Sequence, residues 1–244
     1  MKKNGKPQRR KLKTKRSQSK KKSSFGTKQF AESTFNIQTG CEYGCYYCFA
    51  CANAVGRFHR IDDWTAPVFH LKNVKKSFRK GSGRVMFPSS HDITPHNLDV
   101  CLATLRKLLD AGREVVLVTK PNYVCVEILT HNLADYKDQL ILRFTITSYD
   151  DETTRVWEPH APLFGERLQS LRHAFVAGFT TSVLIEPLLD VEPYAIVAEV
   201  DPYVNQNIWI GRMNHGRSRL TLNGVTDEFL FDLHDEVLEY QSFH

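Results

Sequence analysis

Short apolar runs alternate with longer amphipathic stretches over most of this chain, which is the pattern of βα units. The apolar runs predict strands over residues 35–38, 85–87, 114–118, 140–146, 181–185 and 207–210. The amphipathic stretches predict helices over residues 49–60, 96–111, 122–133, 165–177, 193–200 and 229–240. Strands that alternate with helices form a parallel sheet, so the predicted fold class is α/β. Six strands are too few to close an eight-stranded barrel, and we therefore predict an open, partial (β/α)6 barrel.

The positive charge of the chain is concentrated at its N-terminus. The 244 residues have a net charge of +6, but residues 1–28 hold 13 Lys or Arg and no Asp or Glu. The rest of the chain carries 20 basic and 27 acidic residues, a balance of −7. We predict a disordered basic tail over residues 1–29, because this composition supplies almost no apolar surface to bury. The tail could bind nucleic acid through the phosphates or serve as a solubilising or targeting arm, and both interpretations stay open.

Three cysteines, Cys41, Cys45 and Cys48, follow the first predicted strand with C-x3-C-x2-C spacing. Thiolates suit iron–sulfur clusters, zinc and Cu(I), and three on one loop can bind three irons of a four-iron cluster. Because such clusters are normally held by four thiolates, the fourth iron is left for an external molecule that chelates through an amine and a carboxylate.

Cys51 follows Cys48 after two further residues, which leaves a structural zinc site as an alternative. Structural zinc usually takes two separated pairs of ligands, so one crowded run of four thiols matches it poorly. A disulfide is a further alternative, but six cysteines in a chain without a secretory signal indicate a reducing compartment, the cytoplasm. We expect Cys51, Cys101 and Cys125 to be small buried side chains.

The string over residues 39–50, Thr-Gly-Cys-Glu-Tyr-Gly-Cys-Tyr-Tyr-Cys-Phe-Ala, resembles the signature of the radical S-adenosylmethionine (SAM) enzymes. It is most similar to the branch of spore photoproduct lyase and the DNA-repair-photolyase-like proteins, and weaker similarity extends over residues 35–215. Tyr47 fits, since an aromatic residue commonly precedes the third cysteine. The resemblance implies a [4Fe-4S] cluster on the three cysteines, with SAM on the open iron. An electron donor such as flavodoxin or ferredoxin would then drive cleavage of SAM to a 5′-deoxyadenosyl radical, which abstracts hydrogen from the substrate.

Polar residues end most of the predicted strands, where the chemistry of such barrels takes place. The resemblance places the methionyl amine of SAM at Ser89, Ser90 and Asp92, its ribose at Thr145, Thr147 and Ser148, and its adenine side at Glu186 and residues 209–211. We expect Lys120 to pair with the SAM carboxylate, because a compact ammonium suits a single anionic group, and Tyr47 to belong to the same site. The structural alternatives are that the Ser and Thr residues cap helices and that Glu158 and Arg167 form an ion pair.

The resemblance favours a lyase that acts on a DNA lesion or another nucleic-acid base. The alternatives are a radical SAM enzyme acting on a peptide or small metabolite, and a zinc-containing nucleic-acid-binding protein. The predicted organisation is a tail over residues 1–29, the (β/α)6 domain over residues 30–225 and an acidic helix within residues 226–244, packed on the barrel. No apolar run is long enough to span a membrane, so we expect no membrane segment.

Overall fold

A six-stranded parallel sheet forms the centre of the fold in the computed structural model, which describes residues 26–58 and 63–242. The strand order is β1-β4-β5-β6-β7-β8, so every strand of this sheet pairs with the next one along the chain. The strands are β1 (Ser33–Thr34), β4 (Arg84–Phe87), β5 (Glu114–Thr119), β6 (Leu140–Thr145), β7 (Thr180–Ile185) and β8 (Ile208–Ile210). A separate antiparallel pair consists of β2 (Gln38–Thr39) and β3 (Val68–Phe69).

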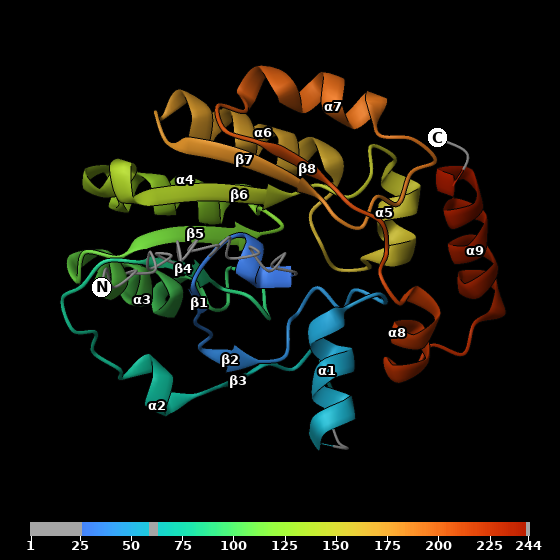
Figure 1. Cartoon of the computed structure of the whole chain (residues 1–244), viewed down its shortest axis with the longest axis horizontal. Coiled ribbons are helices and arrows are strands. Elements are labelled where there is room, and N and C mark those ends of the chain that lie inside the picture. The colour runs from blue at the N-terminus through green and yellow to red at the C-terminus, as the bar shows by residue number, and fades with distance from the viewer. Residues whose placement is uncertain (1–25, 59–62, 243–244) are drawn as a thin grey trace, which may run out of the picture.

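Helices connect the strands, and the principal ones cover the outer face of the sheet (Figure 1). These are α3 (Leu98–Asp110), α4 (Tyr123–Asn132), α6 (Phe164–Val176) and α7 (Tyr194–Val200). The others are α1 (Phe49–Phe58), α2 (Leu71–Val74), α5 (Asp151–Trp157), α8 (Gly216–Leu222), α9 (Glu228–Ser242) and the 3-10 turns η1 (Gly26–Gln29), η2 (Ala134–Gln139) and η3 (Asp201–Tyr203). None of the helices in the described ranges is long and apolar enough to cross a membrane.

The predicted α/β fold, an open six-unit barrel, is confirmed, and the elements from β4 to β8 lie close to their predicted positions. All six residues of β6 are buried, and β5 and β7 are buried along most of their length. Strands buried on both faces appear in a sequence as nearly continuous apolar runs, which is why the pattern located them. The main core between the sheet and the outer helices includes Phe87, Leu105, Leu117, Phe144 and Leu171.

The prediction of a first strand over residues 35–38 is wrong in position. β1 consists of the exposed polar residues Ser33 and Thr34, which carry no apolar signal, and Gln38 pairs with Phe69 in the small sheet instead. The apolar Phe35 and Ile37 suggested the strand because they are buried in the main core. Helices of seven residues are too short to show a clear helical period; among the described residues, α5 and α8 were missed, whereas α7, of the same length, was predicted.

The gap between the two edge strands of the open sheet is bridged by aromatic side chains. Phe30, just before β1, and Trp209 on β8 form an edge-to-face pair with ring centroids 5.2 Å apart. The buried Arg143 of β6 reaches both rings, with its guanidinium carbon 4.5 Å from the Phe30 centroid and 5.6 Å from that of Trp209. Side chains of the two edges therefore meet although β1 and β8 share no hydrogen-bonded ladder.

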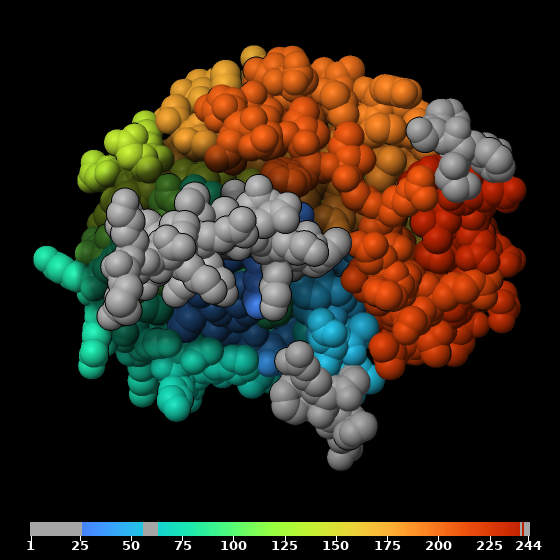
Figure 2. Space-filling view, viewed as in Figure 1, coloured from blue at the N-terminus to red at the C-terminus, as the bar shows by residue number. Residues whose placement is uncertain are grey.

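The C-terminal helices form a second packing unit beside α1. Helix α8 contacts α1 and α9, and Figure 2 shows α1 (cyan) and the segment of α8 (orange-red) as adjoining parts of one surface. A second hydrophobic cluster joins Leu220 of α8 and Leu230 of α9 to Cys41, Cys45 and Tyr47. The C-terminal helices therefore pack directly on the cysteine-containing loop.

Gly216, the first residue of α8, gives a test of this packing. A Cβ at this position would overlap the ring of the buried His234 on α9 and lie 2.9 Å from Sδ of Met213. We expect Gly216→Ala to lower the free energy of unfolding by about 1–3 kcal/mol, because the rigid ring has to move. Urea unfolding followed by circular dichroism measures the change.

Gly165→Ala is the matched control. Gly165 lies in the first turn of α6, and nothing lies within 4 Å of the position that its Cβ would take. This substitution should stabilise the protein by about 0.5–1 kcal/mol through the lower entropy of the unfolded chain. Equal unfolding free energies for the two variants would contradict the close packing of α9 on α8.

Candidate functional site

The three spaced cysteines lie on a loop between β2 and α1 that glycine shapes at two points. Gly40 and Gly44 have φ values of 95° and 59°, which favour glycine over other residues. A Cβ at Gly40 would lie 2.8 Å from the backbone oxygen of Trp64, and the amide of Cys41 donates to that same oxygen at 2.8 Å. Glycine at position 40 is thus what lets the loop approach the segment after α1 so closely.

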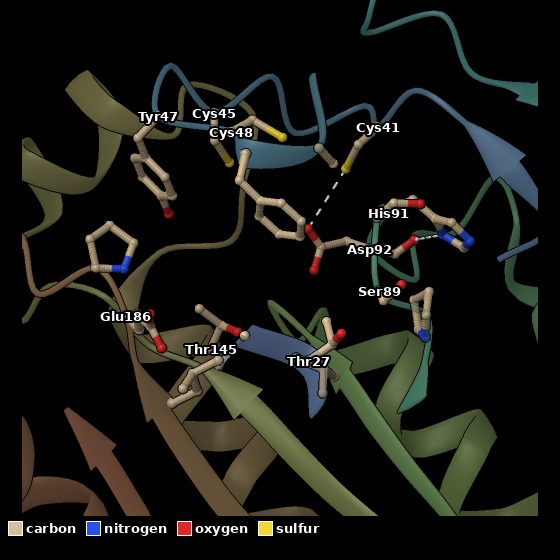
Figure 3. A pocket seen from close by; sticks show the side chains of 18 of the residues that line it. Thr27, Cys41, Cys45, Tyr47, Cys48, Ser89, His91, Asp92, Thr145 and Glu186 are labelled. Carbon is tan, nitrogen blue, oxygen red and sulfur yellow. Dashed lines mark hydrogen bonds between the residues drawn. The ribbon is translucent and has the colours of Figure 1, made fainter. Parts of the chain in front are cut away.

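A cavity of about 700 Å³ adjoins this loop, and Cys41, Cys45 and Cys48 all line it (Figure 3). The volume is in the range of small-molecule sites. The three thiols are free of disulfides. Cys51 is also free but does not line the cavity; its backbone amide lies 3.4 Å from Sγ of Cys48. The structure therefore groups three of the four neighbouring thiols on one wall.

Cys51, Cys101 and Cys125 are all buried, as the sequence predicts, with at most 8% of each side chain exposed. Cys101 and Cys125 belong to the main core between the sheet and its outer helices. They have the role of small apolar side chains.

Burial raises the pKa of each cavity thiol above its usual range. The pKa of Cys45 rises to about 12, and burial also raises those of Cys41 and Cys48. The nearby Asp92 carboxylate adds to the effect on Cys41, whose Sγ lies 3.7 Å from Oδ2 of Asp92. Thiols bind metals as thiolates. A metal ion beside these buried thiols would supply the positive charge that stabilises their thiolate form.

A carboxylate and an ammonium reach the same cavity from the ends of β4 and β5. Asp92 accepts hydrogen bonds from the hydroxyl of Thr119 at 3.0 Å and the amide of Lys120 at 2.6 Å. Nζ of Lys120 lies 3.6 Å from Oδ2 of Asp92. Burial alone would lower the pKa of Lys120, but Asp92 and Cys45 raise it well above its usual range. The cavity thus has a fixed positive group beside a carboxylate, both at the ends of strands.

Ser89 and Ser90 also line the cavity, and Asn36 holds both in place. Oδ1 of Asn36 accepts the amides of Ser89 at 2.7 Å and Ser90 at 3.0 Å, while its Nδ2 donates to Oγ of Ser89 at 2.9 Å. The sequence analysis did not identify Asn36. The available signal was a polar residue between the apolar Phe35 and Ile37, shortly before the cysteine motif.

His91 fixes the turn that carries Asp92. Its Nδ1–H donates to the backbone oxygen of Asp92 at 3.0 Å, and its Nε2 accepts the amide of Ile37 at 3.4 Å. Burial lowers the pKa of His91 to about 4, so the ring is neutral at physiological pH and can make both contacts. The turn after β4 is therefore anchored to the segment after β1 through both His91 and Asn36.

Thr145 and Glu186 line the cavity at the ends of β6 and β7 (Figure 3). The side chain of Glu186 lies over Gly211, where a Cβ would come within 2.9 Å of Cγ of Glu186. Partial burial raises the pKa of Glu186, while Arg219 opposes this shift. A glycine after β8 thus leaves the space in which Glu186 reaches the cavity.

Thr147 and Ser148, by contrast, do not line the cavity. The hydroxyl of Thr147 donates to Oε1 of Glu158 at 2.7 Å, and that of Ser148 donates to Asp190. Both residues are buried, with 0% and 2% exposure. Of the residues predicted to contact SAM, Thr147, Ser148 and residues 209–211 are the ones that do not line the common cavity.

Glu158 is the centre of a buried network behind the cysteine loop. Its carboxylate accepts hydrogen bonds from Tyr47, Thr147 and the guanidinium of Arg167. Burial alone would raise the pKa of Glu158, but Arg167 and Lys120 lower it below its usual range, so the group is ionised. The predicted Glu158–Arg167 ion pair is present, and Tyr47 presents its ring to the cavity while its hydroxyl is held here.

The residues on this wall could hold the [4Fe-4S] cluster and SAM that the resemblance implies. Three free thiols could bind the cluster, Lys120 could pair with a carboxylate, and Asp92 could accept from an amine. Nε1 of Trp64, on the same wall, is buried without a hydrogen-bond partner among the described residues and can donate to a bound group. The described part of the chain contains no group of three or more His, Cys, Asp or Glu placed to hold a single metal ion.

Two further parts of the cavity wall were not among the predicted SAM contacts. One is the N-terminal segment, which contributes Thr27 and Phe30, and the other lies on and before α8. The α8 side contributes Arg212, Asn214, His215 and Arg219. Their signal in the sequence is a run without acids, since residues 211–226 contain no Asp or Glu.

The incomplete parallel α/β barrel of this chain has the fold of spore photoproduct lyase. A lyase variant superposes with a TM-score of 0.58 at 14% identity over 90% of this chain and 77% of the lyase. A variant with bound AdoMet and dinucleoside spore photoproduct superposes with a TM-score of 0.56 at 15% identity over 78% of this chain and 59% of the lyase.

Two relatives are similar in sequence. An uncharacterized protein of Acidianus two-tailed virus is 28% identical over 167 residues, which are 63% of this chain and 54% of the viral protein. An uncharacterized protein of Methanocaldococcus jannaschii is 24% identical over 183 residues, which are 72% of this chain and 68% of that protein. The chain thus spans about half the length of the viral relative. No protein-family model matches the sequence.

The Glu158 network predicts a large effect from a small substitution. Glu158→Gln leaves the buried Arg167 without its counter-charge, and we expect a loss of about 3–5 kcal/mol in the free energy of unfolding. Replacing both residues by Met should cost less than the single change, because no unpaired charge remains buried. Chemical denaturation of the single and double variants measures the difference.

Glu114→Gln is the control for loss of a carboxylate. Glu114 pairs with Arg84 at 2.8 Å, but both side chains are well exposed. Its substitution should cost at most about 1 kcal/mol. A double variant less stable than Glu158→Gln alone would show that the ion pair does not account for the effect.

Proposed function

We propose that the protein is a radical SAM enzyme that holds a [4Fe-4S] cluster on Cys41, Cys45 and Cys48 and binds SAM in the adjoining cavity. The observation that carries the proposal is that the three spaced thiols share one cavity with the Asp92–Lys120 pair. When bound, the cluster and SAM supply a 5′-deoxyadenosyl radical that abstracts a hydrogen atom from the substrate. The shared fold with spore photoproduct lyase, one structure of which contains AdoMet, supports this proposal.

The residues at the ends of β4 and β5 would bind the amino-acid part of SAM. The ammonium of Lys120 pairs with a carboxylate, and the carboxylate of Asp92 accepts from an amine, so the two fixed charges match a zwitterion. Ser89 and Ser90 add hydroxyl groups, which Asn36 holds in position. Because these groups are positioned before any ligand binds, little side-chain entropy is lost on binding.

The remaining walls would bind the nucleoside part. Thr145 offers a hydroxyl to the ribose from the end of β6, and Glu186 lies on the side proposed for adenine. The ring of Tyr47 is held by the Glu158 network and closes the cavity beside the cysteines. The protein thereby orients the reacting groups and excludes water, while the bond-breaking chemistry belongs to the cofactors.

We propose a nucleic-acid base lesion as the substrate class. The support is the fold of spore photoproduct lyase, structures of which hold a dinucleoside spore photoproduct, together with the 13 Lys or Arg of residues 1–28. The basic residues would hold nucleic acid through its phosphates. A low-potential donor such as flavodoxin or ferredoxin would supply the electron, and such a reduced partner places the reaction in the cytoplasm.

Reductive cleavage of SAM tests the cofactor proposal. The protein is purified without oxygen, reconstituted with iron and sulfide and mixed with dithionite and SAM, and 5′-deoxyadenosine and bound iron are measured. We expect the unaltered protein to form 5′-deoxyadenosine and Cys45→Ala to form none, because a lost thiolate leaves the cluster one ligand short.

Cys51→Ala is the matched control, since Cys51 belongs to the same segment but does not line the cavity. It should keep its iron and most of its activity. Loss of both in Cys51→Ala, with tight binding of zinc instead of iron by the unaltered protein, would favour a four-thiol zinc site and a nucleic-acid-binding function.

Removal of residues 1–25 tests the nucleic-acid partner. The deletion removes 12 Lys or Arg, so the affinity for DNA should fall and depend less steeply on salt concentration. Cleavage of SAM without DNA should continue, since the shortened chain keeps the N-terminal residues that line the cavity, Gly26, Thr27, Gln29 and Phe30. An unchanged salt dependence, or a cleavage rate in the full chain that DNA does not affect, would favour a peptide or small metabolite as substrate.

A further inference from the structure

The cavity wall next to α8 carries positive charge that the proposed cofactor site does not use. Residues 211–226 contain three Arg and one His and no Asp or Glu. Arg212, His215 and Arg219 line the cavity. Since α8 contacts α1, which follows the cysteines directly, this wall adjoins the cysteine loop (Figures 1 and 2). A molecule that reaches the cysteine end of the cavity can therefore also reach these cations.

Most cations around the site already have partners. Lys120 pairs with Asp92, Arg217 pairs with Asp235 on α9, and Arg212 donates to the backbone oxygen of Gln241. Arg219 differs from them. It is half-buried and forms no hydrogen bond or ion pair with any described residue, although its guanidinium carbon lies 6.0 Å from the ring centroid of Phe49. A partly desolvated charge without a hydrogen-bond partner is unfavourable, so Arg219 is open to a bound anion.

The acids of the cavity do not neutralise Arg219. Asp92 is engaged by Thr119 and by the amide and ammonium of Lys120. Cys48 and Glu186 act on Arg219 only at longer range, since no hydrogen bond or ion pair joins either residue to it. The described part of this wall therefore keeps an excess of positive charge.

His215 gives a second sign that the wall has a binding role. Among the described residues, His215 is the one residue other than glycine with a positive φ, 57°. It directly precedes the first residue of α8. Such backbone strain is held in place by the surrounding structure and is common at ligand sites. His215 is exposed, lines the cavity and lies four residues before Arg219, within one helical turn.

We propose that Arg219, assisted by His215, forms a phosphate-binding subsite at the α8 wall of the cavity. The planar guanidinium can donate two parallel hydrogen bonds to one phosphate, a geometry that the ammonium of Lys120 does not offer. Under the proposed function, the substrate would carry a phosphate next to the group that reaches the cysteine end of the cavity. This part of the inference rests on the proposed function, whereas phosphate binding by Arg219 does not.

Two pairs of ligands, each with one negatively charged and one neutral member, test the subsite. Dithymidine phosphodiester and its neutral methylphosphonate analogue are titrated into the full-length protein at physiological ionic strength, without added cofactors. Thymidine 5′-monophosphate and thymidine form a second pair. We expect tighter binding of the charged member, with the phosphodiester preferred if the source is a nucleic-acid strand and the monoester if it is a free nucleotide.

Arg219→Gln should weaken binding of the charged probe about tenfold and leave the neutral analogue unaffected, because a charge-assisted hydrogen-bond pair is lost. Arg219→Lys, which keeps the charge but not the fork, should give an intermediate loss. Arg217→Gln is the matched control on the same helix, since Arg217 faces Asp235 and does not line the cavity. It should bind both probes as the unaltered protein does, and thermal unfolding verifies that all variants are folded.

Three results would overturn the subsite. In one, the unaltered protein does not distinguish charged from neutral probes in either pair. In another, Arg217→Gln loses as much affinity as Arg219→Gln, which would indicate that the overall positive charge of the chain, and not Arg219, attracts the charged probe. In the third, Arg219→Gln keeps the phosphate preference but loses affinity for SAM, which would assign Arg219 to the cofactor. Because binding is measured without the cluster, failure of SAM cleavage would leave the subsite result intact.

Discussion

Glu158 is ionised although it is almost fully buried, and a charge in such a place is tolerated only when good partners surround it. Those partners come from three separate parts of the chain: Tyr47 on the cysteine loop, Thr147 after β6 and Arg167 on α6. The loop that carries the thiols belongs to no strand of the main sheet. Its position relative to the strand ends therefore depends on this one carboxylate as well as on backbone contacts such as that of Cys41 with Trp64.

The cysteine loop also depends on the far end of the sequence. Leu220 and Leu230 share a hydrophobic cluster with Cys41 and Cys45, and Nδ2 of Asn223, just after α8, donates to the backbone oxygens of Tyr46 and Cys48. The loop thus lies between the Glu158 network on one side and the C-terminal helices on the other. Substitutions in α8 or α9 that touch no cavity residue can therefore alter the placement of the thiols.

Local sequence signals located most of the fold and several residues of the cavity wall. The buried strands are continuous apolar runs, and the cysteines, Asp92 and Lys120, singled out by their spacing or by their place at strand ends, all line one cavity. Thr147 and Ser148 were singled out in the same way but do not line the cavity, because periodicity does not show where the chain turns away from the sheet after β6. Asn36 and Arg219 could not have been found in this way. The hydrogen bonds of Asn36 join residues 53 and 54 positions apart, and the acid-free run over residues 211–226 does not show which of its cations lacks a partner among the described residues.

The aromatic bridge between Phe30 and Trp209 affects how the barrel can respond to what it binds. Strands joined by a ladder are held at a fixed spacing, since separation breaks several hydrogen bonds at once. The two edges of this sheet meet through ring contacts instead, and aromatic pairs are favourable over a range of centroid distances and angles. Phe30 also lines the cavity. The contact between these two edges, beside the wall of the cavity, therefore tolerates a wider range of positions than a hydrogen-bonded ladder would.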